Sequence, residues 1–144
     1  MADLDERFSS ALHNTSRACR QALDRRLKYL GLSQASWMTI AVAAKAASPL
    51  SQSELADRLA VEGATMVSMV DRLVKAGLVN REPSRTDRRV KRIVLTDAGN
   101  SLYGKVRAEA TAFRRELLAN VDSKRLLAAT ELLESLQGVI DTAP

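Results

Sequence analysis

The chain has 144 residues, of which 46% are apolar, 3% aromatic and 27% charged, and its formal net charge is +5. This length predicts one compact domain, and the single cysteine, Cys19, excludes an intrachain disulfide. One cysteine and one histidine cannot supply an ordinary zinc site. The first ten residues are acidic and lack the apolar segment of a signal peptide, and the uncharged run 32–44 is too short to span a bilayer. We therefore expect a cytoplasmic protein without metal, other cofactor or membrane partner.

Glycine and proline residues divide the chain into six helical segments and one extended stretch. The first helix is expected over residues 4–30, and the second runs from an N-cap at Ser33 to about residue 47. Ser51 and Glu54 have the spacing of a capping box, which predicts the start of a short third helix. The inward residues of that helix are expected to be Leu55, Ala56 and Leu59.

A four-residue connection, 60–63, leads into a fourth helix that ends at Gly77. Its expected inward face is apolar: Met66, Met69, Val70 and Leu73. Its expected outward face consists mostly of small or polar residues: Ala64, Thr65, Val67, Ser68, Asp71 and Arg72. Two short helices joined by a tight turn are typical of a helix-turn-helix, whose second helix enters the major groove of DNA. An ordinary helical hairpin gives the same pattern, so these helices alone leave both interpretations open.

The next segment is expected to be a β-hairpin, because two β-prone runs, 78–82 and 90–95, flank a polar tip. Residues 81–92 contain six basic and two acidic side chains, a local charge of +4. A wing that lies along a minor groove needs such a charge, because narrow grooves concentrate negative potential and attract arginine. Asp87 can hold the guanidinium of Arg89 in one geometry. The alternative is a charge run that only increases solubility.

Two more helices are expected at the end of the chain. Thr96 can cap a fifth helix that reaches about residue 120, and Asp122 or Ser123 can cap a sixth. The first, fifth and sixth helices carry long apolar stripes that the small central region cannot cover. A second copy would bury these stripes, and a two-fold dimer would place two recognition helices roughly 34 Å apart on a palindromic site.

Three segments together resemble the MarR family, and most closely its SlyA-like branch: 53–56, 69–79 and 87–99. The resemblance implies a mostly α-helical fold with a small β-hairpin wing, in one MarR-type domain over residues 1–144. In that fold a winged helix-turn-helix, 33–95, is flanked by dimerisation helices, 4–30 and 97–141. It also implies a homodimeric, sequence-specific transcription regulator of duplex DNA.

The resemblance further implies that Arg89 enters the minor groove, that Asp87 orients it, and that the fourth helix faces the major groove. The full expected DNA-contact set is Ala64, Thr65, Val67, Ser68, Arg72, Arg85, Asp87, Arg88, Arg89 and Lys91. SlyA-like members often carry arginine at the position of Ser68, so recognition here is expected to depend more on Thr65, Arg72 and groove shape. Family members bind small aromatic acids beside the dimer core. The resemblance therefore implies relief by an aromatic or phenolic ligand in a pocket lined by His13, Arg17 and Trp37.

Several other interpretations compete with these. His13 can be an ordinary surface or interface residue, and Trp37 a core residue. Cys19, close to Arg17 and Arg20, is either a half-buried thiol or the centre of a redox-sensing regulator. A winged helix that binds protein instead of DNA would need an apolar outer face on the fourth helix, where Val67 is the only sizeable apolar residue. The sequence shows no Ser-His-Asp set, metal cluster or glycine-rich phosphate loop, so we expect no enzyme activity.

Overall fold

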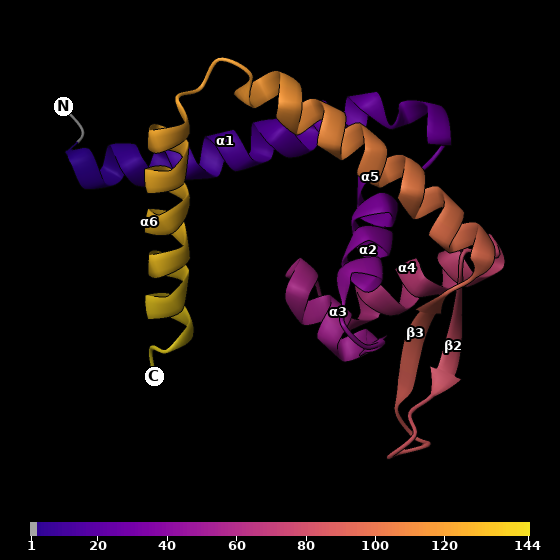
Figure 1. Ribbon diagram of the computed structural model, residues 1–144. Helices are drawn as coiled ribbons and strands as arrows, with labels where there is room; N and C mark the ends of the chain where they lie inside the picture. The colour runs from indigo at the N-terminus through magenta and orange to yellow at the C-terminus, as the bar shows by residue number, and fades with distance from the viewer. Residues whose placement is uncertain (1–2) are drawn as a thin grey trace. The chain divides into compact units, whose positions relative to one another are not determined.

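The computed structural model describes residues 3–144, which belong to two compact units, Met1–Thr111 and Ala112–Pro144 (Figure 1). The first unit holds α1 (Leu4–Arg26), η1 (Lys28–Leu30), α2 (Gln34–Lys45), β1 (Leu50–Ser51), α3 (Gln52–Leu59), α4 (Gly63–Lys75), β2 (Val79–Pro83), β3 (Lys91–Leu95) and the start of α5 (Asp97–Leu118). The second unit holds the end of α5 and α6 (Ser123–Asp141). The predicted fold class, mostly helical with a small sheet, is confirmed.

The predicted helix starts are confirmed by their caps. The Ser33 hydroxyl accepts from the Ser36 N–H at 3.2 Å, and the carboxylate of Asp122 accepts from the Arg125 N–H, also at 3.2 Å. The first helix, however, ends four residues earlier than expected. The chain tightens at the buried residue Leu27 into the 3-10 turn η1, which ends at Gly31 with a φ of 71°. Glycine adopts this left-handed conformation without steric cost, so the turn stops there.

The sheet has three antiparallel strands in the order β1-β3-β2. The expected hairpin is present, with Val79 opposite Leu95 and Glu82 opposite Arg92. The strand β1, in which Leu50 lies opposite Ile93, was not predicted from the sequence. Two residues are too few to show strand periodicity, and the second of them also serves as the α3 N-cap.

The main core lies where α2, α3, α4 and the sheet meet, and Ile40, Leu55, Val70, Val79 and Ile93 are almost completely buried there. A smaller cluster of Leu27, Trp37 and Val106 joins the end of α1 to α2 and α5. Because all four expected inward residues of α4 are buried, the opposite face of that helix is exposed. Packing therefore fixes which side of α4 a ligand can reach.

The junction between β3 and α5 is held by Thr96. Its hydroxyl donates to the carbonyl oxygen of Gly77 at 2.6 Å and accepts from the N–H of Gly99 at 3.1 Å. A Cβ atom on Gly99 would lie only 2.1 Å from the carbonyl oxygen of Leu78. Thr96 and Gly99 therefore meet a packing requirement: the threonine joins two turns, and a residue without a Cβ lets α5 approach them.

Candidate nucleic-acid interface

The outer face of α4 is polar and open to solvent. Every residue predicted to point outward is exposed: Ala64, Thr65, Val67, Ser68, Asp71 and Arg72. Val67, at 41% exposure, is the only large apolar side chain among them. The side chain of the N-cap residue Glu62 makes no capping hydrogen bond to the first turn of α4. A helix face of this kind can approach base edges and phosphates closely.

The helix that packs against α4 and supports it is α3, which begins with the predicted capping box. The Ser51 hydroxyl accepts from the Glu54 N–H at 3.1 Å, and the Glu54 carboxylate accepts from the Ser51 N–H, also at 3.1 Å. The hydrogen bonds from the backbone and side chain of Ser51 lower the pKa of the Glu54 carboxyl below its ordinary 4.5. Between the two helices, Ala60 turns the chain with a φ of 54°.

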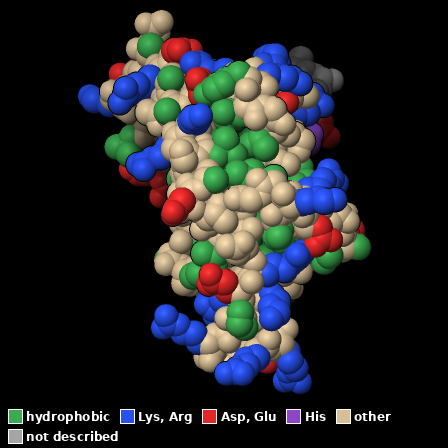
Figure 2. Space-filling view, turned by 90° about the vertical axis from the view of Figure 1, so that its right-hand side faces the viewer, with side chains coloured by type: hydrophobic (Ala, Val, Ile, Leu, Met, Phe, Trp, Pro, Cys, Tyr) green, Lys and Arg blue, Asp and Glu red, His purple; other side chains and the backbone are tan. Residues whose placement is uncertain are grey.

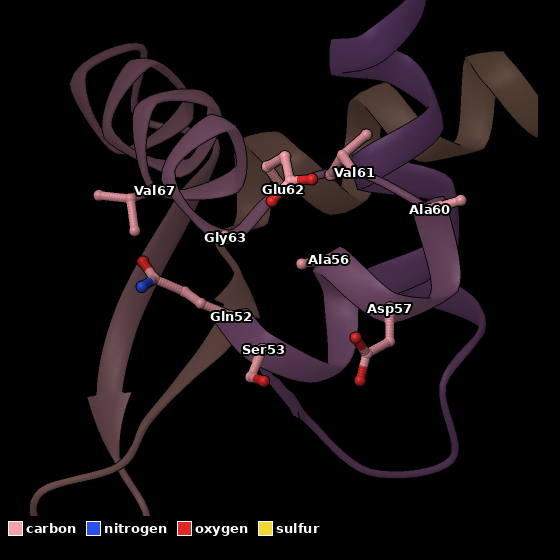
Figure 3. A pocket seen from close by; sticks show the side chains of 9 residues that line it. All are labelled: Gln52, Ser53, Ala56, Asp57, Ala60, Val61, Glu62, Gly63 and Val67. Atoms are coloured by element: carbon pink, nitrogen blue, oxygen red, sulfur yellow. The ribbon is translucent and has the colours of Figure 1, made fainter.

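A groove of about 540 Å³ separates α3 from the start of α4. Figure 3 shows its lining, in which Gln52 extends from α3 toward Val67 on α4, while Glu62 and Gly63 close the other side. Ser53 and Asp57 lie on the rim, away from Val67. The groove is polar on the α3 side and open, and it lies directly beside the exposed face of α4.

The wing tip, residues 84–90, is closed by short polar contacts. The N–H of Ser84 donates to the carbonyl oxygen of Val90 at 2.8 Å, and the Ser84 and Thr86 hydroxyls lie 3.1 Å apart. Asp87 Oδ1 accepts from the backbone N–H of Arg89 at 3.0 Å and from its Nε at 3.3 Å. The side chain of Arg89 is nevertheless 92% exposed. Asp87 therefore orients Arg89 while leaving the outer edge of its guanidinium in solvent.

Cationic side chains gather at this tip. Figure 2 shows them at the lower end of that view, over the β2–β3 hairpin. Arg85, Arg88, Arg89 and Lys91 are exposed, and Arg88 has no ion-pair partner within residues 3–144. However, not every basic side chain of the hairpin is free to contact a ligand. Arg81 is engaged by neighbouring groups, and Arg92 is partly buried.

Arg81 is the residue that the sequence analysis missed. Its Nε donates to Gln52 Oε1 at 2.7 Å, and its Nη2 donates to Asp71 Oδ1 at 2.5 Å and to the carbonyl oxygen of Val67 at 3.4 Å. One guanidinium thus joins β2 to both α3 and α4. The sequence carries a signal for this link, since an arginine in the first strand of a hairpin can reach the preceding helix, but its charge alone fits DNA binding equally well.

The three residues predicted to line a ligand pocket differ in their burial. His13 and Arg17 are exposed on α1. Trp37 is buried on α2, and its indole Nε1 donates to Asp24 Oδ1 at 2.9 Å. Trp37 is therefore a core residue with a satisfied polar atom, and the pocket itself stays a prediction.

Within residues 3–144 no cluster of histidine, cysteine and carboxylate side chains could hold a metal ion, and no helix is long and apolar enough to cross a membrane.

A brace helix, an exposed second helix and a cationic hairpin define a winged helix-turn-helix protein. A model of the MarR family matches residues 30–90. The solved structure of the transcriptional regulator PA3341 is similar over 94% of this chain and 99% of that one, with a TM-score of 0.88 and 36% identity. The chain belongs to the MarR family of transcriptional regulators.

More distant structures share the fold. A MarR protein from Peptoclostridium difficile DA00132 has a TM-score of 0.82 and 22% identity, over 97% of this chain and 91% of that one. CouR from Rhodococcus jostii RHA1, solved with bound p-coumaroyl-CoA, has a TM-score of 0.79 and 23% identity, over 94% and 95% of the two chains. The SlyA-like branch stays a prediction.

Proposed function

We propose that the protein binds duplex DNA as a homodimer and regulates transcription, with α4 in the major groove and the β2–β3 wing in the adjacent minor groove. The observation that carries this proposal is the linkage of the two elements. Because Arg81 contacts both Gln52 and Asp71, the exposed face of α4 and the hairpin belong to one surface. A duplex can therefore meet both at once.

In the major groove, Thr65 and Ser68 are the residues that we assign to base edges and nearby phosphates, with Arg72 further along the helix. All three side chains are exposed on α4. Ala64 and Val67 offer apolar contact of the kind that thymine methyl groups accept. Without a long cation at position 68, base discrimination rests on short side chains and therefore on close approach of the helix.

In the minor groove, Arg89 is the inserted side chain, held by Asp87. A guanidinium that is oriented before binding loses less conformational entropy when the complex forms. Arg85, Arg88 and Lys91 are assigned to flanking phosphates, where each contact releases counterions from the DNA.

Dimerisation is supported by apolar side chains that remain exposed in each unit. On α1, Leu4, Phe8 and Leu12 are exposed. On α6, seven large apolar side chains are exposed, and four of them follow helical spacing: Leu126, Leu133, Leu136 and Ile140. Solvated apolar faces of this length are typical of interfaces, so we assign them to a second copy and expect a palindromic site. This assigns 4–30 and 97–141 to dimerisation and 33–95 to DNA binding.

The proposal is tested by selecting bound duplexes from a random pool and measuring the mass of the complex. We expect two chains per duplex and a palindromic consensus with half-sites about one helical turn apart. A protein that stays monomeric and shows no preference for duplex DNA at low ionic strength would contradict it.

We also propose that a small aromatic acid relieves DNA binding through a pocket lined by His13 and Arg17, to which Trp37, buried in the core, is not assigned. Support comes from Arg17, whose exposed guanidinium on α1 can pair with a carboxylate, and from CouR, a protein of similar fold that was solved with bound p-coumaroyl-CoA. Titrating aromatic carboxylic acids into the complex with the selected duplex should release the DNA. Arg17→Ala should abolish this release while Arg7→Ala, an equal charge change on the same helix, preserves it. Equal release from both variants would remove Arg17 from the site.

A further inference from the structure

The hairpin holds a second cationic site, which shares Arg85 and Thr86 with the wing tip and adds Arg92 from β3. A cavity of about 470 Å³ lies there between the loop that follows α2 and the base of the wing. Its lining includes Ser48, Glu82, Arg85, Thr86, Arg92 and Val94. Two of these six side chains are guanidinium groups and two are hydroxyls, which are the donors that oxyanions require.

Arg92 lines this cavity from β3, the central strand of the sheet. It lies opposite Glu82 on β2 and opposite Ser51 on β1, in the middle of the sheet. Its Nε atom is buried and has no hydrogen-bond partner within residues 3–144. Arginine cannot become neutral, so a buried N–H of this group needs an acceptor.

The neighbouring carboxylates do not provide that acceptor. Within residues 3–144 no ion pair joins Arg92 to Glu82, although the two residues are cross-strand partners. Glu54 is near enough for the charge of Arg92 to contribute to lowering its pKa, yet its carboxylate hydrogen bonds to the Ser51 N–H. Arg92 therefore lines the cavity while its buried Nε has no acceptor within residues 3–144.

Arg85 supplies the second charge. It is exposed on the wing loop and lines the same cavity, and the neighbouring Thr86 hydroxyl contributes a donor beside it. Glu82 also lines the cavity, and its negative charge repels an anionic ligand. A doubly charged oxyanion gains more from the two guanidinium groups than a singly charged carboxylate ligand does, so it fits this cavity better.

We propose that Arg92 and Arg85 form an oxyanion site for a phosphate group, between the base of the wing and the loop after α2. Its occupant is either a backbone phosphate of a bound duplex or a free phosphate-bearing molecule. The site includes Arg92, which the proposed duplex interface does not use, and it binds phosphate whether or not the duplex assignment holds.

The test is a titration of the DNA-free protein with inorganic phosphate at constant ionic strength, followed by the NMR signal of the Arg92 Nε–H. We expect a saturable shift. Arg85→Ala should weaken the apparent affinity roughly tenfold through loss of a charge-assisted contact, and Glu82→Gln should strengthen it several-fold. Arg7→Ala, which removes the same charge from α1, should change neither. A linear, non-saturating response, or equal phosphate binding by Arg85→Ala and Arg7→Ala, would overturn the proposal.

A second titration identifies the source of the phosphate group. If the selected duplex displaces inorganic phosphate from Arg92, the site holds a backbone phosphate, and Arg92→Gln should also reduce the salt dependence of duplex binding by about one phosphate contact. If phosphate and duplex bind together, the site holds a free molecule. Either result supports the site. A failure of duplex binding with a saturable phosphate titration would overturn the proposed function and leave this site intact.

Discussion

The carboxylate of Asp87 accepts two hydrogen bonds from Arg89, one from its backbone N–H at 3.0 Å and one from its Nε at 3.3 Å. The pair is solvent-exposed, with 92% of the Arg89 side chain and 41% of the Asp87 side chain accessible, so its contribution to folding stability is small. Its consequence is geometric, because it selects one direction for an otherwise mobile cation.

Removing the negative charge of Asp87 tests whether the residue acts through its charge or by orienting Arg89, because the two roles predict opposite changes in duplex affinity. Asp87→Asn makes the wing more positive. If Asp87 acted only through its charge, this variant would bind the duplex more tightly. We expect the reverse, a loss of roughly tenfold, because an unoriented Arg89 pays more conformational entropy on entering the groove. Fluorescence anisotropy at fixed ionic strength measures the difference, and tighter binding by Asp87→Asn would show that Asp87 does not position Arg89.

Arg81 and Asp71 are expected to stabilise the wing against α4. Their side chains are 28% and 60% exposed, so a double-mutant cycle of Arg81→Ala and Asp71→Ala should give a coupling free energy of only about 0.5–1 kcal/mol. The larger effect should be local: backbone amides of β2 should exchange faster with deuterium in Arg81→Ala. Unchanged exchange would mean that the hairpin is held by its strand pairing alone.

Gly99→Ala is expected to be severely destabilising, because the added Cβ would lie 2.1 Å from the carbonyl oxygen of Leu78. A clash with backbone cannot be relieved by a rotamer change, so we expect a loss of about 2–4 kcal/mol in the free energy of unfolding. Denaturant unfolding measures it. Gly104→Ala is the matched control on the same helix, since a Cβ there would meet nothing within 4 Å. Equal stability of the two variants would show that the α5 junction tolerates a side chain.

Glu54 makes folding stability depend on pH in the acid range. The hydrogen bonds from Ser51 lower its pKa in the folded state below the ordinary 4.5, so the unfolded chain binds this proton more readily. The stabilisation is therefore present above pH 4.5 and is lost as the pH falls through the lower folded-state pKa. Thermal unfolding of Glu54→Gln should show a shallower decline in this range than the unmodified protein, and parallel curves would contradict the expectation.

Much of the fold was predictable because local signals agreed with one another. Caps at Ser33 and Ser51, apolar spacing on α4 and the polar tip of the hairpin each indicated the element that the structure contains. The two-residue strand β1 was not predictable, since its pairing with Ile93 depends on residues more than forty positions away. The break at Leu27 was missed for a similar reason: helical spacing continues to Leu30, and only the packing of Leu27 against α2 and α5 shows where the helix ends.

For the candidate site, the sequence predicted which side chains are exposed but not which are engaged. Arg81 and Arg89 look equivalent in the sequence, as basic residues of one hairpin. In the structure Arg81 has three acceptors from two helices, whereas Arg89 has one neighbouring carboxylate and a guanidinium edge in solvent. Tertiary contacts of this kind separate an internal link from a surface cation.

The central claim, that an oriented wing arginine and α4 bind one duplex together, is tested most directly by Arg89→Ala across a salt series with the selected duplex. We expect at least a tenfold loss of affinity and a salt slope lower by about one phosphate equivalent, while unfolding is unchanged and Arg7→Ala binds like the unmodified protein. Identical binding and salt slope for Arg89→Ala and the unmodified protein would contradict the claim.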